Sequence, residues 1–203
     1  SNKITFAIWF NSTTTVGSDT GYTILTRGNI SSVNGCFVLM VRNNNEFQCW
    51  FYDDSGTSPN PVLGQGTDFR NYNDGNWHHI AITIDGTLAQ PALKMYLDGA
   101  LASSTTSPNT GINQPAASVN QLLLGQRQYT YSTLGAKYSN LCTFDDVLEL
   151  TGTQSITSLY NNGLPPDVSN YNNLTGWYKL DQLDSYWDIA GTANWTISNE
   201  AIN

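Results

Sequence analysis

Hydrophobic residues alternate with a period of two in two neighbouring stretches, and these stretches predict the centre of the fold. Residues 77–84 place isoleucines on one face and further apolar residues on the other, which is the pattern of a β-strand covered on both faces. Residues 93–97 alternate in the same way and lead into Asp98-Gly99. Because Asp and Gly accept the positive φ angles of a tight turn, this dipeptide predicts a hairpin that reverses the chain.

Shorter runs of the same pattern predict the remaining strands. Residues 35–42 and 46–53 should pair as a hairpin around three consecutive asparagines. That pairing sets position 36 nearly opposite position 52, and position 49 nearly opposite position 39. The other predicted strands are residues 3–10, 22–26, 121–125, 137–144 and 175–181.

Three segments carry little periodicity and are predicted to lie at the rims of the domain. Residues 54–76 are rich in Gly, Pro, Asn and Asp, and residues 102–118 in Ser, Thr, Pro and Asn, so both are predicted as long loops. Residues 126–133 are predicted as an exposed turn with two tyrosines. Loops of such length in a compact domain often carry function.

The C-terminal third changes character. Apolar residues within 156–160 stand at i, i+3 and i+4, which predicts a short amphipathic helix that Gly163 ends. Pro165-Pro166 marks a boundary after it. Residues 169–203 are therefore predicted to be an extension that packs on the main domain or links to a further module.

Several of these runs resemble one family of β-sandwich domains. The run WHHIA at residues 77–81 and the run MYLDG at residues 95–99 resemble the laminin-G-like, concanavalin A-like jelly-roll domains, including those of phage virion proteins and adhesins. Residues 3–10 resemble a core strand of that family, and residues 144–163 resemble its ending. In the family another strand usually precedes the one at 3–10, so we expect the first strand to be missing from this sequence.

The resemblance implies an all-β fold, a two-sheet antiparallel jelly-roll sandwich over residues 1–168 with one short C-terminal helix. The length of 203 residues suits a single β-sandwich unit. Such modules are recognition or adhesion units when they lack catalytic carboxylates. Fold alone does not decide between sugar and protein partners.

Composition excludes some functions. Charged residues make up 12% of the chain, the net charge is −8, and Lys and Arg together number eight, so the clustered cations that nucleic-acid binding needs are missing. No apolar run is long enough to insert into a membrane, and no signal peptide is recognisable.

Cys36, Cys49 and Cys142 are an odd number; the hairpin register opposes a bridge between the first two, and all three are predicted to be small core residues.

Catalysis finds little support in the sequence. Retaining glucanases need two carboxylates about 5 to 5.5 Å apart, and no such run lies on the predicted strands. The acidic cluster of Asp145, Asp146 and Glu149 falls in the turn before the helix, where capping explains it. His78 and His79 are consecutive, so they point to opposite faces of a strand and cannot easily bind one metal together. The resemblance implies that they pack structurally. We therefore predict that the protein is not an enzyme.

Two binding sites remain as candidates. Calcium prefers oxygen ligands, and the long loop with its flanks supplies carboxylates and an amide; the family's final-strand acidic pair, however, is replaced here by Tyr138-Ser139-Asn140-Leu141. The calcium candidates are Asp53, Asp54, Asp68, Asn73 and Asp74. A sugar site needs an aromatic face beside amides or carboxylates. Its candidates are Tyr72, Asn73 and Asp74 in one loop and Tyr129 and Tyr131 in another, which alternatively are exposed turn residues or contacts to a neighbouring subunit.

The sequence thus favours a non-enzymatic, surface-exposed recognition or adhesion module. The hypothesis places it in a virion decoration or fibre protein, or in an adhesin, at the virion surface or outside the cell, with glycans or neighbouring subunits, including copies of itself, as partners. A purely structural protein–protein module is the first alternative. A glycoside hydrolase is the second, and it requires carboxylates that the predicted strands do not carry.

Overall fold

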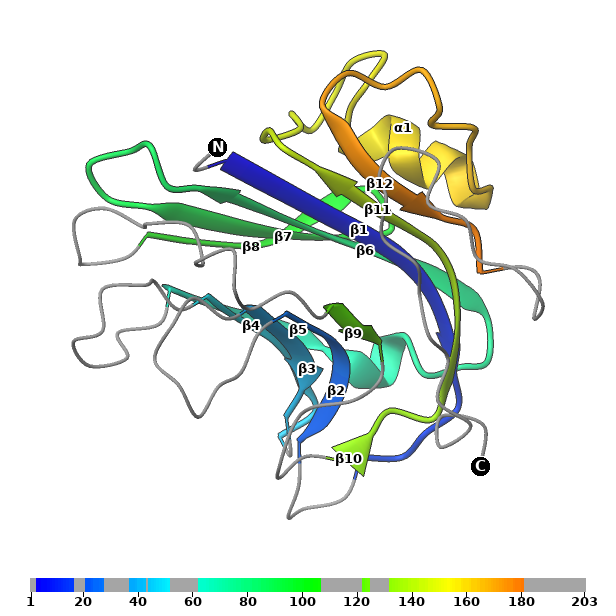
Figure 1. Cartoon of the computed structure of the whole chain (residues 1–203). Helices are drawn as coiled ribbons and strands as arrows, with labels where there is room; N and C mark the ends of the chain where they lie inside the picture. The colour runs from blue at the N-terminus through cyan, green and yellow to red at the C-terminus, as the bar shows by residue number, and fades with distance from the viewer. Residues whose placement is uncertain are drawn as a thin grey trace.

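The fold is a sandwich of two β-sheets with one short helix on its outside (Figure 1). The computed structural model describes residues 3–16, 21–27, 37–42, 44–51, 62–106, 122–124 and 132–180. The larger sheet, sheet A, has the order β12 (Leu174–Tyr178), β11 (Ala136–Phe144), β1 (Lys3–Ser12), β6 (Trp77–Asp85), β7 (Ala92–Leu97) and β8 (Ala100–Thr106), with every pairing antiparallel. This confirms the predicted two-sheet jelly-roll architecture.

The opposing sheet, sheet B, has the order β10 (Ser132–Thr133), β2 (Tyr22–Arg27), β3 (Phe37–Val41), β4 (Glu46–Phe51) and β5 (Val62–Asp68), and β9 (Leu122–Leu124) also pairs with β2. Among the described strands, only the two-residue strand β10 runs parallel to its neighbour. In the β3–β4 hairpin, Leu39 lies opposite Cys49, which confirms the predicted register.

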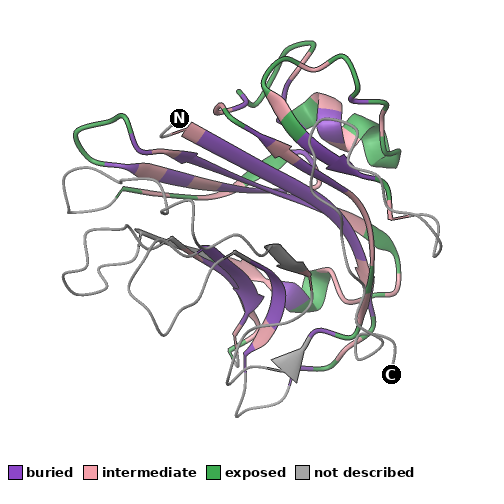
Figure 2. Ribbon diagram, viewed as in Figure 1, coloured by how far each residue is buried: buried purple, intermediate pink, exposed green. Residues whose placement is uncertain are grey.

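The main core lies between the sheets and is built from the inward residues of the alternating strands. Phe6 of β1 stacks on Phe37 of β3, with ring centroids 4.6 Å apart. Phe10, Phe47 and Phe69 form an aromatic cluster at one end, and all three are fully buried. Figure 2 shows the buried residues running along the facing surfaces of both sheets.

A second core covers the outer face of sheet A. Ala7 of β1 lies opposite Ala81 of β6, and these small side chains leave room for apolar residues that follow β11 and surround α1 (Ile156–Tyr160). The residues of this core are Ala7, Ala81, Tyr96, Cys142, Phe144, Leu148, Ile156, Leu159, Val168 and Trp177. Strand β6 is therefore buried on both faces along most of its length, as predicted.

Helix α1 is held by its caps. The Ser155 hydroxyl accepts a hydrogen bond from the Ser158 backbone N–H, and the Ser158 hydroxyl accepts one from the Ser155 N–H, which is the reciprocal pattern of a capping box. The helix ends at Asn161, whose φ is 43°. Gly163 was predicted to end it; a left-handed asparagine does so two residues earlier, because Asn tolerates that conformation.

The β7–β8 turn forms at the predicted dipeptide, where Asp98 has φ 48° and Gly99 φ 76°. The positive φ of Gly99 already disfavours a side chain at this position. The Tyr160 ring disfavours it further, because a Cβ at position 99 would lie 2.8 Å from that ring. The hairpin and the helix are thus fitted to one another.

Two predicted loops contain strands. Residues 54–76 were predicted as one long loop, but β5 pairs with β4 within it and a 3-10 helix, Phe69–Asn71, follows. Residues 102–118 were also predicted as a loop, but β8 continues to Thr106 through its pairing with β7. Both strands lack apolar alternation and form because a neighbouring strand supplies the hydrogen bonds.

The C-terminal extension contributes one described strand, β12, which pairs with β11 at the edge of sheet A. Cys49 lies in the core between the sheets and Cys142 in the outer core; both are buried free thiols, as predicted. Cys36 lies outside the described residues. No described helix has the length and apolarity needed to cross a membrane.

Truncation of the aromatic cluster should test the main core. We expect Phe10→Ala to lower the free energy of unfolding by about 3–5 kcal/mol, because it removes a fully buried ring and leaves a cavity. Leu88→Ala, at a side chain that is 47% exposed, is the control and should cost about 0.5 kcal/mol or less. Urea unfolding followed by tryptophan fluorescence measures both, and equal losses would contradict the assignment of the core.

Candidate functional site

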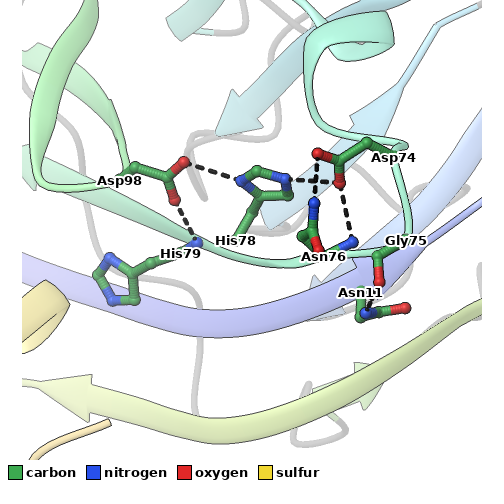
Figure 3. A network of polar contacts seen from close by, with 7 residues as sticks. All are labelled: Asn11, Asp74, Gly75, Asn76, His78, His79 and Asp98. Atoms are coloured by element: carbon green, nitrogen blue, oxygen red, sulfur yellow. Dashed lines mark hydrogen bonds and ion pairs between the residues drawn. The ribbon is translucent and has the colours of Figure 1, made fainter. Parts of the chain in front are cut away.

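Polar side chains form a network at the rim where β6 begins (Figure 3). His78, the second residue of β6, points to the inner face and lies between two carboxylates. Its Nδ1 is 2.8 Å from Asp98 Oδ2 and its Nε2 is 3.1 Å from Asp74 Oδ1. Each ring nitrogen thus lies within hydrogen-bonding distance of one carboxylate, so His78 links the β7–β8 turn to the loop that precedes β6.

Asp98 holds this turn against β6. Its Oδ1 accepts a hydrogen bond from the His79 backbone N–H at 2.8 Å, and its own N–H donates to the His79 carbonyl at 2.9 Å. The Asp98 carboxylate therefore contacts both histidines: the ring of His78 and the backbone N–H of His79.

Asp74 is occupied within its own loop. One oxygen accepts from the Asn76 backbone N–H and the other from the Asn76 side-chain amide, each at 2.8 Å. These bonds, followed by the contact with His78, lower the pKa of Asp74 to about 2. The loop is also joined to β1, because the Asn11 amide donates to the Gly75 carbonyl and the Gly75 N–H donates to the Ser12 carbonyl.

The predicted sugar residues of the first loop lie together at this rim. The Tyr72 ring meets Phe47 and His78 edge to face, at 5.7 and 5.0 Å, and burial, followed by the charge of Asp98, raises its pKa. The Asn73 amide donates to the Thr14 carbonyl at 3.3 Å. Through these contacts Tyr72 and Asn73 hold the loop against neighbouring parts of the fold. Tyr129 and Tyr131 lie outside the described residues, so the predicted meeting of the two loops stays a prediction.

Among the predicted calcium ligands, Asp53 and Asp54 also lie outside the described residues. Asp68 pairs with Arg70, with 2.6 Å between Oδ2 and Nη2, and Asp74 is bound as described above. Within the part of the chain that the structure describes, no group of three or more His, Cys, Asp or Glu side chains is placed to hold a metal ion.

One pair of carboxylates lies on neighbouring described strands. Glu46 of β4 is opposite Asp68 of β5. Glu46 accepts from the Asn44 amide at 2.7 Å, and hydrogen bonds from Arg70 lower the pKa of Asp68. A general acid for glycoside cleavage needs a raised pKa, so the environment of Asp68 does not fit that role.

His79 points to the outer face, away from His78, as the alternation predicts. Its ring lies against Trp9 at 5.2 Å and Tyr160 at 6.3 Å. Burial lowers its pKa to about 3, so the ring is neutral at physiological pH. Its Nδ1 has no hydrogen-bond partner among the described residues.

Sequence reasoning missed one feature of this rim. Trp77, the first residue of β6, was assigned to a covered face, but it is 45% exposed. The cover over the outer face extends to Tyr160, which lies over His79 and Trp9. No signal in the strand alternation shows where that cover stops.

The sequence and the fold place the chain in a known family. Residues 1–152 match the model of the laminin G-like family described as the concanavalin A-like lectin/glucanases superfamily, and the chain belongs to that family. No curated protein sequence matches the chain.

Solved structures share the fold at low identity. The carbohydrate-binding module CBM40 of the Ruminococcus gnavus IT-sialidase, bound to α2,3-sialyllactose, is similar over 73% of this chain and 79% of its own, with 16% identity and a TM-score of 0.53. A putative carbohydrate-binding protein from Bacteroides ovatus is similar over 92% of this chain and 49% of its own, with 15% identity and a TM-score of 0.57. Domains LG4-5 of the mouse laminin α1 chain are similar over 73% and 37%, with 15% identity and a TM-score of 0.52.

Removal of the Asp98 carboxylate should loosen the rim. We expect Asp98→Ala to lower the free energy of unfolding by about 1–3 kcal/mol, because the His79 N–H loses its side-chain acceptor. Asp98→Asn is the matched variant and should cost less, because it keeps an acceptor and tolerates the φ of 48°. Chemical unfolding measures both; an equal loss in the two variants would contradict the role given to the hydrogen bond.

His79 should make stability depend on pH. Its folded pKa of about 3 lies below the ordinary histidine pKa of 6.5, so the unfolded chain binds the extra proton between those values and stability falls as pH is lowered through that window. From pH 7.5 to 5 this group should remove about 2 kcal/mol. His79→Gln should lose correspondingly less over the same range in urea unfolding, because the carboxylates are shared by both proteins; identical pH dependence would contradict the assignment.

Proposed function

We propose that this chain is a non-enzymatic carbohydrate-recognition module, displayed on the surface of a larger assembly such as a virion decoration or fibre protein or an adhesin. Family membership over residues 1–152 is the observation that carries the proposal. It is supported by similar structures whose own ligands are glycans, including the sialyllactose-bound module and the botulinum neurotoxin type C described as interacting with ganglioside.

The chemistry of the described surface also supports recognition without catalysis. The Glu46–Asp68 pair is held by Asn44 and Arg70, and the pKa of Asp68 is lowered. The low fraction of charged residues, 12%, leaves amides and hydroxyls as the main polar groups, and these are the groups that bind sugar hydroxyls.

A structural module that binds other protein subunits is the second candidate. It is favoured by the internal use of Tyr72, Asn73 and Asp74, whose rings and polar groups contact the rim itself. The two functions differ in stoichiometry, because a structural module should bury a large surface against copies of itself or another subunit.

A glycan array probed with the purified chain tests the proposal. We expect reproducible binding to a defined set of glycans, and the array is probed with calcium and again with chelator. Binding that requires calcium would support the predicted calcium site, for which Asp53, Asp54 and Asp74 are the candidates. A folded chain that binds no glycan under either condition, and that self-associates in sedimentation velocity, would favour the structural module instead.

A further inference from the structure

Trp77 is the one aromatic residue among the large apolar side chains that stand exposed in the described part of the chain; the others are leucines. Its backbone is fixed, because it pairs with Asn11 as the last rung between β6 and β1. Successive side chains alternate between faces. Since His78 contacts Phe10 of the inner core and His79 contacts Trp9 outside it, Trp77 lies on the outer face of sheet A.

Two polar residues continue the row across the sheet. Asn11 of β1 lies opposite Trp77, and Lys137 of β11 lies opposite Asn11. Because neighbouring strands are about 4.8 Å apart, this Trp77 row of indole, amide and ammonium spans about 10 Å, which is the scale of one or two sugar rings.

The polar groups of the row are available to a ligand. The Asn11 amide nitrogen donates to the Gly75 carbonyl, which leaves its side-chain oxygen as an acceptor. Lys137 is exposed and forms no ion pair with a described residue. The row therefore offers an apolar face, an acceptor and one positive charge.

On one side of the Trp77 row, an aromatic ring packs over the sheet. The next residues along the strands, Trp9 and His79, are covered by the Tyr160 ring, which lies nearly parallel to the Trp9 ring at 5.8 Å. The 3-10 turn Asn161–Gly163 follows and packs against β6, and Asn161 and Asn162 are exposed. The exposed indole thus stands where the cover of the outer face ends.

These observations identify a class of ligand. A tryptophan face suits the C–H face of a pyranose, and amides suit its hydroxyls. One lysine in a chain of net charge −8 matches a single anionic substituent, whereas a polyanion would be repelled by the acidic chain.

We propose that the Trp77 row binds a glycan through a pyranose stacked on Trp77 and a single carboxylate or sulfate paired with Lys137. This rests on the proposed carbohydrate-recognition function and assigns it to the outer face of sheet A rather than to the side chains of Tyr72, Asn73 and Asp74. The pairing with Lys137 selects glycans that carry an acidic substituent. The stacking on Trp77 selects for the pyranose ring itself.

The test compares variants on lactose, 3′-sialyllactose and 3′-sulfolactose, together with the strongest array ligand and its desialylated or desulfated counterpart. Trp77→Ala should weaken binding about tenfold or more, and Trp77→Phe should retain part of it because a smaller aromatic face remains. Lys137→Gln should weaken binding to the acidic glycans and leave their neutral counterparts unchanged; the relative loss for carboxylate and sulfate shows which anion is preferred. Leu88→Ala, at an exposed leucine in the β6–β7 connection, is the control and should bind as the wild type does.

The outcomes separate the two proposals. If the wild-type chain binds glycans and Trp77→Ala binds equally well, the assignment to this row is wrong while the recognition function stands. If the wild type binds no glycan on the array, the recognition function fails and the assignment fails with it.

Loss of self-association in Trp77→Ala with unchanged glycan binding would make the row a subunit interface and overturn the proposal. Equal loss for acidic and neutral glycans in Lys137→Gln would overturn the role of the anion. Unchanged thermal unfolding midpoints show that each variant is folded.

Discussion

The pairing of β1 with β6 is the constraint on which the rest of the structure depends. Nine consecutive residue pairs join these strands at the centre of sheet A, and each strand presents large apolar residues inward and a second, mixed set of residues outward that includes Ala7, Ala81 and Trp9. The inward residues build the core between the sheets, and the Ala7–Ala81 pair on the outer face allows α1 and its flanking segments to approach closely. One ladder therefore supports two cores, because the alternation of a strand presents two different surfaces.

The same alternation organises the rim. Three consecutive residues of β6 enter three different surroundings: Trp77 meets solvent, His78 joins two carboxylates, and His79 is buried beneath Tyr160. The two histidines are adjacent in the sequence but differ in their surroundings, since the His78 ring contacts two carboxylates and the His79 ring is buried among aromatic rings. The surroundings of each rim residue are therefore set by where the segments packed over each face of the sheet end, rather than by residue type.

Much of the fold could be predicted from the sequence, because its strongest signals are local. The isoleucines of β6 identify a strand, Asp98-Gly99 identifies a turn, and the asparagines between β3 and β4 fix the pairing of Leu39 with Cys49. Strand β5 could not be predicted, since its residues do not alternate and it forms by pairing with β4.

The candidate site was less accessible, for a physical reason. Asp74 and Asp98 are 24 positions apart, and only the fold shows that both contact His78. Trp77 was identified as a strand residue, but its exposure depends on the end of the α1 cover, which is encoded about 80 residues later. Side chains that depend on distant segments carry no local signal of their partners.

The two buried thiols have a further consequence. Cys49 belongs to the core between the sheets and Cys142 to the core under α1, and burial raises the pKa of both thiols. Because the thiolate is the reactive form, each cysteine stays inert until its own core opens to water. Among the described residues each core therefore holds one cysteine, and the rates at which Cys49 and Cys142 react with a thiol reagent distinguish separation of the sheets from opening of the helix cover.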